Sequence, residues 1–344
     1  MPGDEWAKQR DALLGQRISD LGLTIRGSRV ERLIDQLDAE LAARGLRFRP
    51  PAYLSDQWGC PDGTPLIGVP FYLADPRLER IEAEMSLSVE SDVEAMRYLR
   101  HEAGHAYNYA FRLHERDDWR ALFGSFASPY RDRYRANPFS RDHVRHILAW
   151  YAQKHPDEDF AETFAVWLTP ESDWRREYAG WPALRKLEYV DRVMAELAPL
   201  QPDVLEPCDD DLPVEAMRYS LAEHYEEERD PIPVEDERQF DADLRQIFVQ
   251  ATDAPAGEVA AVFLLRHYRE IVTRTSFWTS EHPSVVRSLL DLLARRAEAL
   301  GLRVGALEAA TLIELSAFAT AVVMLHRHTH VIGRARTRAT GMAR

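Results

Sequence analysis

The chain has 344 residues, a length more typical of two folded domains than of one. Apolar residues make up 45% of the chain and charged residues 29%, which excludes a mostly disordered protein. The formal net charge of −14 has the wrong sign for a protein whose main partner is a nucleic acid. Only two cysteines, Cys60 and Cys208, are present. A disulfide framework is therefore excluded, and we expect a cytoplasmic protein with two unpaired thiols.

Neither export nor membrane insertion is expected. The first ten residues, MPGDEWAKQR, contain two acids and no apolar stretch, so no secretory signal is predicted. The longest apolar stretch covers residues 306–325, but Glu308 and Glu314 interrupt it. We predict a buried helix there rather than a membrane span, and hence no membrane partner.

The first confident element in chain order is a helix over residues 29–44. Ser28 and Glu31 have the spacing of a capping box, in which the side chain of each residue accepts a hydrogen bond from the backbone N–H of the other. Apolar residues then recur with helical spacing until Gly45, a typical helix stop. Helices dominate again from about residue 90.

Two strands are predicted between these helical regions. Residues 47–58 and 65–74 are rich in aromatic and branched side chains, and a turn signal at 61–64 separates them. Pro70 lacks a backbone N–H, so it places the second strand at the edge of a sheet. The N-terminal domain, residues 1–200, is therefore expected to be of the α+β class.

An acidic segment, residues 201–237, follows this domain. Between residues 201 and 240 there are fourteen acids, three arginines and five prolines, so most of the net negative charge lies here. High charge combined with proline predicts a solvated linker. The alternative is a docking or autoinhibitory element that occupies the cleft of the preceding domain.

The C-terminal domain, residues 238–333, is predicted to be all-α. Apolar residues follow helical spacing in about four segments, and no strand pattern is present. No polar constellation suggests chemistry, so we interpret this domain as structural or as the binding site of a protein partner. The three histidines and Arg327 at 326–330 and the basic tail, 334–344, are interpreted as a solvated terminus.

The strongest chemical signal is the pentapeptide His101-Glu102-Ala103-Gly104-His105. Residues four apart on a helix share one face, so both imidazoles can reach one metal ion while Glu102 points toward its open position. The helical context is independently good, because Ser91 and Glu94 form a second capping box. The rival interpretation is a solvated helix that carries two unrelated histidines.

A catalytic zinc site needs a third protein ligand. The best source is a helix that begins at Pro156, where Glu158 and Glu162 lie four residues apart on one face. One of the two carboxylates can bind the metal while the other accepts the N–H of a ligand histidine. Three further histidines lie between or beside the motifs and are expected to have surface or capping roles: His143, His146 and His155.

The combination of His-Glu-x-x-His with a later Glu-x-x-Ala-Glu resembles the gluzincin metallopeptidases. The form found here, Tyr-x-x-x-His-Pro-x-Glu-Asp-Phe-Ala-Glu-Thr beginning at Tyr151, is similar to a bacterial family of zinc-binding metallopeptidases and, more distantly, to the catalytic domain of anthrax lethal factor. These motifs lie within residues 91–168. The resemblance implies a zincin-like fold for residues 1–200. It also implies a Zn²⁺ ion bound by His101, His105 and Glu158, with Glu102 as the general base. Glu162 would accept the N–H of a ligand histidine, and Tyr151 would donate its hydroxyl near the developing oxyanion.

The sequence thus predicts a zinc-dependent metallohydrolase, most simply a peptidase that acts on a peptide or protein substrate. By analogy with zincins, an extended substrate would lie along the strand at 65–74. Two alternatives remain open. One is an amidase or isopeptidase that acts on a non-protein amide. The other is a non-catalytic zincin-fold protein that binds a partner through its helical domain.

Overall fold

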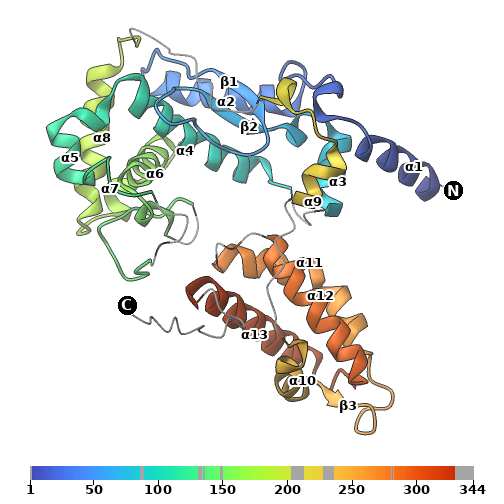
Figure 1. Cartoon of the computed structure of the whole chain (residues 1–344). Coiled ribbons are helices and arrows are strands. Elements are labelled where there is room, and N and C mark those ends of the chain that lie inside the picture. Colours follow the sequence, from blue (N-terminus) through green and yellow to red (C-terminus); the bar gives the residue numbers. More distant parts are fainter. Residues whose placement is uncertain are drawn as a thin grey trace, which may run out of the picture. The chain divides into compact units, whose positions relative to one another are not determined.

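The computed structural model describes residues 2–85, 89–130, 134, 136–147, 150–202, 213–227, 236–279, 281 and 283–329 (Figure 1). The chain divides into two compact units, one formed by Met1–Met85 with Val89–His224 and the other beginning at Tyr225. We call them the N-terminal and C-terminal units and describe each by itself. Three predicted features lie wholly or largely outside the described residues: Cys208, the basic tail, and much of the acidic segment.

The N-terminal unit is mainly helical. Its α-helices are α1 (Pro2–Leu14), α2 (Arg29–Ala43), α3 (Pro76–Met85), α4 (Asp92–Ala110), α5 (Asp117–Phe123), α6 (Pro156–Leu168), α7 (Trp174–Glu177), α8 (Ala183–Leu197) and α9 (Leu221–Glu227), the last of which crosses the division between the units. Short 3₁₀ helices are η1 (Ile18–Asp20), η2 (Phe71–Ala74), η3 (Leu113–Glu115), η4 (Tyr151–Gln153) and η5 (Val214–Ala216).

The sheet of this unit consists of two short parallel strands, β1 (Ala52–Ser55) and β2 (Ile67–Pro70). Both predicted strands exist, but each is shorter than expected. The far side of β2 is also covered, because Gly59 exchanges two backbone hydrogen bonds with Gly68. All four residues of β2 are buried. The expectation that 65–74 forms an open edge for substrate is therefore wrong.

The helix starts follow the predicted polar signals in two different ways. At α4 the Ser91 hydroxyl accepts the Glu94 N–H while the Glu94 carboxylate accepts the Ser91 N–H, so the capping box is confirmed. At α2 the predicted helix is confirmed, but the reciprocal box is not formed. There the Ser28 hydroxyl accepts from Val30, and the Glu31 carboxylate accepts from Gly27.

Helices α4 and α6 pack directly against each other and form the centre of the N-terminal unit (Figure 1). They cross where Gly104 faces Ala161. A Cβ atom at Gly104 would lie 2.7 Å from the Ala161 Cα atom and 2.9 Å from its carbonyl oxygen. Only glycine therefore permits this close approach, and the approach brings the polar faces of the two helices together.

The described part of the acidic segment is folded rather than solvated. Residues 213–227 form η5 and α9, and the backbone N–H groups of Ile18 and Ser19 donate to the carbonyls of Tyr219 and Met217. Val214, Met217 and Leu221 are buried. These apolar residues lie in η5, just after it and at the start of α9, so no single helical repeat joins them in the sequence.

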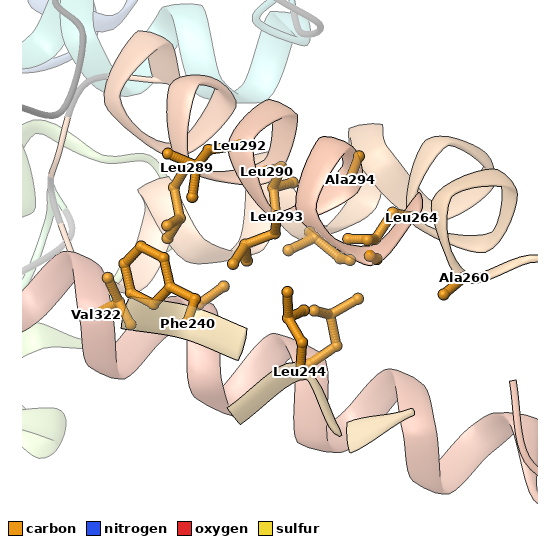
Figure 2. Close-up of a cluster of buried hydrophobic side chains, with 14 of the residues drawn as sticks. Phe240, Leu244, Ala260, Leu264, Leu289, Leu290, Leu292, Leu293, Ala294 and Val322 are labelled. Carbon is orange, nitrogen blue, oxygen red and sulfur yellow. The ribbon is translucent and has the colours of Figure 1, made fainter. Parts of the chain in front are cut away.

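The C-terminal unit is a helical bundle whose elements are η6 (Glu237–Phe240), α10 (Asp241–Ile247), β3 (Val249–Gln250), α11 (Ala260–Thr279), α12 (Pro283–Ala299), β4 (Leu302–Arg303) and α13 (Glu308–Thr329). Figure 2 shows the core between these helices, where Leu289, Leu290 and Leu293 of α12 meet Phe240 and Leu244. The all-α prediction is wrong in one detail, because β3 and β4 pair in an antiparallel fashion. They escape the sequence pattern because each has two residues.

Helix α13 contains the predicted apolar helix. Within the described part of the chain, α13 alone has the length and composition to cross a membrane, over Glu308–His326. Only 33% of this apolar stretch is buried inside the protein. Leu315, Ala319 and Val323 are fully buried in the bundle core. One face of α13 thus packs into the bundle core, so the prediction of a buried helix is confirmed for that face only. Taken together, the described residues are mostly helical with small sheets, which is compatible with the α+β class.

Candidate metal centre

The two motifs of the sequence meet at the α4–α6 crossing. His101 and His105 lie one turn apart on α4, and Glu158 lies in the first turn of α6. The two Nε2 atoms are 3.1 Å apart, and Glu158 Oε2 lies 3.0 Å from the Nε2 atom of His101 and 3.2 Å from that of His105. All three side chains are buried. The fold therefore converges three potential ligand atoms on one point.

These spacings fit a tetrahedral zinc ion. Zinc bonds of about 2.0–2.1 Å to nitrogen or oxygen place neighbouring ligand atoms about 3.3 Å apart at the corners of a tetrahedron. The observed separations of 3.0–3.2 Å are close to that value. Two imidazoles and one carboxylate are also the donor set of a catalytic zinc site that keeps one position open.

Each imidazole has a carboxylate behind it, on the side away from the convergence point. His101 Nδ1 lies 2.9 Å from Glu162 Oε1, and His105 Nδ1 lies 2.8 Å from Asp157 Oδ2. With a proton on each Nδ1 atom, both Nε2 lone pairs face the convergence point, as metal binding requires. Glu162 was predicted for such a role, whereas sequence reasoning missed Asp157.

Both supporting carboxylates are themselves held in place. Asp157 accepts hydrogen bonds from the amide of Asn108 and the hydroxyl of Tyr109, each at 2.6 Å. Glu162 Oε2 accepts the backbone N–H groups of His146 and Ile147 at 3.2 and 2.8 Å. Two layers of hydrogen bonds therefore fix the orientation of His101, whereas His105 has a short contact with a carboxylate that is itself held by hydrogen bonds.

The electrostatics of the cluster favour a cation at its centre. Burial alone lowers the pKa of His101, but hydrogen bonds to Glu158 and Glu162 outweigh burial and raise this pKa to about 9. For Glu158, burial raises the pKa, but the two imidazoles prevail and hold it well below its ordinary value. The site thus takes up positive charge strongly.

Glu102 and Tyr151 lie beside the convergence point. Both line a pocket of about 470 Å³ together with His101, His105 and Glu158. The Glu102 side chain is nearly buried, and burial raises its pKa although the two imidazoles oppose the shift. The Tyr151 ring packs edge-on against the His101 ring, with 5.6 Å between the ring centroids. All six predicted site residues are thus brought to one place.

One wall of the pocket is the chain segment 58–62, which follows β1. Trp58, Gly59, Cys60 and Asp62 line the pocket, and Trp58 stacks on Tyr98 with 5.6 Å between ring centroids. Cys60 is a free thiol, as expected. Among the described residues, neither 65–74 nor any part of the acidic segment lines the pocket.

The three additional histidines occupy structural positions. His155 is the N-cap of α6, where its Nδ1 atom accepts the Asp157 N–H and its Nε2 atom lies 2.9 Å from the Ser128 carbonyl oxygen. His146 Nε2 lies 2.9 Å from the Arg97 carbonyl oxygen, and His143 is half-buried near Asp159. His155 also lines the pocket, so its capping role places it at the site.

A second missed residue is Tyr130. It lines the pocket, and its hydroxyl donates a hydrogen bond to Glu158 Oε1. Its position depends on the path of a long loop between the motifs, and no local pattern in the sequence signals it.

The arrangement defines a class of site: a buried His–His–carboxylate cluster able to hold one metal ion, with a further carboxylate beside it. Residues 78–173 match a family model described as "putative zinc-binding metallo-peptidase". This segment runs from α3 past the end of α6, so the family resemblance predicted from the motifs is confirmed over the part of the chain that builds the cluster. No curated protein and no solved structure matches the chain.

Proposed function

We propose that the protein is a zinc-dependent peptidase. The observation that carries the proposal is the convergence of His101, His105 and Glu158 beside Glu102 in a pocket of about 470 Å³. The match of residues 78–173 to a family of zinc-binding metallopeptidases supports the same metal and the same reaction class.

In this proposal the two histidines and Glu158 hold the metal, and Glu162 supports His101. Zinc in such a site lowers the pKa of a bound water toward about 7 and polarises a carbonyl group. Glu102 accepts the proton of the attacking water and delivers it to the leaving amine. Its buried position raises its proton affinity, which suits a group that must take up a proton and then release it.

Tyr151 is proposed as the hydroxyl donor to the developing oxyanion. It lines the pocket beside His101, and the Lys154 ammonium lies 3.3 Å from its hydroxyl oxygen. A positioned donor of this kind contributes on the order of 3 kcal/mol to transition-state stabilisation.

The segment 58–62 is proposed to receive an extended peptide. Gly59 directs both its backbone polar groups to Gly68, so in an antiparallel pair the groups of Trp58 and Cys60 face the opposite side. A peptide that adds there as a further strand would pass through the pocket. This segment replaces 65–74 as the expected place of substrate binding.

The first test combines elemental analysis of the purified chain with a peptide-library assay. We expect about one zinc per wild-type chain and cleavage of at least one peptide. Glu102→Gln should retain zinc and lose about 10²- to 10⁴-fold in rate, because the proton acceptor is removed. Glu188→Gln, which changes an exposed glutamate on α8, is the matched control and should behave as wild type.

Two results would contradict the proposal. Wild-type chain that takes up no zinc when zinc is supplied would exclude the metal site. A Glu102→Gln variant that cleaves peptides at the wild-type rate would exclude the proposed base.

A further inference from the structure

The three proposed ligands share a feature that becomes visible at their outer atoms. His101 and His105 each turn the nitrogen that does not face the convergence point toward a carboxylate. Glu158 also uses both of its oxygens, because Oε2 faces the imidazoles while Oε1 accepts a hydrogen bond from the Tyr130 hydroxyl. Every proposed ligand therefore has one atom directed at the centre and one atom held from behind.

On this basis we infer that Tyr130 is a positioning residue that holds Glu158 as a ligand through one oxygen only. The inference rests on the proposed metal site and extends it to a residue outside both motifs. A carboxylate whose Oε1 atom accepts a hydrogen bond from a phenol is held so that Oε2 is the oxygen presented to the metal ion. Binding through one oxygen leaves room for the open position that a catalytic site requires.

Tyr130 is anchored by the same helix start that carries Glu158. The Lys154 ammonium donates to the Tyr130 hydroxyl oxygen at 2.8 Å and lies 4.2 Å from the centre of its ring. The His155 ring lies 5.3 Å from the Tyr130 ring and contacts the Ser128 carbonyl two residues earlier. Ser128 and Tyr130 are thus fastened to the residues immediately before α6.

Lys154 also determines how strongly Tyr130 donates. A cation that donates to the phenol oxygen polarises the O–H bond, and linked hydrogen bonds of this kind strengthen one another. The acceptor is ionised, which makes the bond from Tyr130 to Glu158 charge-assisted. The order Lys154 to Tyr130 to Glu158 is therefore a directed relay of hydrogen bonds that ends on a proposed ligand.

The test removes only the hydroxyl, in Tyr130→Phe, and measures zinc affinity by competition with a chelator. The phenylalanine ring preserves the ring contacts with His155 and Lys154, although the Lys154 hydrogen bond is lost with the hydroxyl. Tyr130 is 54% exposed, so the variant is expected to fold. We expect zinc affinity to fall about 10- to 100-fold, the usual effect of losing a group that orients a ligand. Tyr189→Phe is the matched control, since it removes a hydroxyl that donates to Asp118 on the same unit.

A second readout separates positioning of the ligand from general stability. Co²⁺ replaces zinc in such sites, and its visible absorption weakens when coordination rises from four to five ligand atoms. In Tyr130→Phe the freed Oε1 atom can also bind, so we expect a weaker Co²⁺ band than in wild type. Lys154→Met should shift affinity in the same direction by less.

The outcomes distinguish this inference from the proposed function. Wild-type chain without any metal affinity overturns the metal site itself. Wild-type chain that binds zinc, with Tyr130→Phe equal to it in both affinity and Co²⁺ spectrum, overturns the role of Tyr130 and leaves the metal site standing. A weaker affinity with an altered spectrum, and with Tyr189→Phe unchanged, supports it.

Discussion

Two pairs of packed helices illustrate opposite uses of a buried interface. In the C-terminal unit, the buried side of α12 consists almost entirely of leucine, valine and alanine, and it meets the apolar side of α11. In the N-terminal unit, every residue of α6 from Asp157 to Leu168 is buried, although this stretch contains four acids and Thr163.

The difference teaches what each interface needs in order to be stable. Burial of apolar side chains is favourable without further partners. Burial of carboxylates is costly unless hydrogen bonds and cations compensate it. The acids of α6 have such partners in His101, His105 and, for Asp159, the Lys186 ammonium at 2.5 Å. The interface of α6 therefore depends on specific polar contacts, whereas the interface of α12 depends on apolar side chains that fill the space between the helices.

The largest expected effect comes from changing the distance between α4 and α6. Gly104→Ala places a methyl group 2.7 Å from the Ala161 Cα atom, and neither backbone can move without displacing the ligand atoms. We expect the N-terminal unit to lose several kcal/mol of stability, and metal binding to be abolished. Hydrogen exchange measured by mass spectrometry should show lost protection in α4 and α6 but not in α11 and α12.

Two controls sharpen this comparison. Gly15→Ala adds a methyl group with no neighbour closer than 3.8 Å and should leave both units unchanged. Leu290→Ala in the C-terminal unit should cost about 2–5 kcal/mol there, because it leaves a cavity, while metal affinity stays at the wild-type value. Preserved metal binding in Gly104→Ala would contradict the importance of the close crossing.

An intermediate effect is expected from the carboxylates behind the imidazoles. Glu162→Gln replaces the acceptor of the His101 Nδ1 proton by a weaker one, and Asp157→Asn removes the negative charge beside His105 Nδ1. We expect each variant to bind zinc about 10- to 100-fold more weakly, as measured by chelator competition. Asp173→Asn, at an exposed position, is the control. Loss of affinity in Glu162→Gln alone would show that only His101 needs such support.

The smallest effect concerns the pH dependence of the N-terminal unit. Burial and the nearby Lys186 ammonium lower the pKa of His143 to about 4, while Asp142 opposes them. As the pH falls, His143 takes up a proton near pH 6.5 in the unfolded chain but only near pH 4 in the folded chain. The free energy of unfolding therefore decreases as the pH drops from about 6.5 to about 4. His143→Gln lacks this ionisation. Over that pH range its free energy of unfolding should therefore decrease by up to about 3 kcal/mol less than that of wild type.

Thermal unfolding followed by tryptophan fluorescence between pH 7 and pH 4.5 measures this difference. Trp119, Trp167 and Trp174 are buried in the N-terminal unit and report on it. Parallel pH profiles of wild type and His143→Gln would show that His143 does not contribute to the acid sensitivity.

Much of the cluster could be predicted because its signals are local. The capping box at Ser91 and Glu94, and the start at Pro156, fix where the two helices begin. Helical periodicity then places the paired histidines on one face of α4 and the paired glutamates on one face of α6. The sequence left open which glutamate faces the metal position, and the packing of the two helices decides this.

The remaining site residues depend on tertiary structure. Asp157 stands at the helix start, where an acid is adequately explained by the helix dipole, so its contact with His105 is hidden. Tyr130 reaches Glu158 through a loop that carries no periodic signal. The same limit applies to the sheet, since the pairing of Gly59 with Gly68 is a long-range contact that closes the predicted edge.

The contacts of Asp157 have a consequence for how the helix pair is aligned. Three side chains of α4, from His105, Asn108 and Tyr109, converge on this one carboxylate, and the pair of His101 and Glu162 lies one turn farther along. Sliding either helix by a turn, about 5.4 Å, would break all of these contacts at once. Polar contacts therefore set the register of the pair, while Gly104 sets the spacing of the two helices. The α4–α6 crossing therefore aligns its own helices, while the exact orientation of Glu158 and Glu162 also depends on Tyr130 and on the backbone N–H groups of His146 and Ile147 outside the pair.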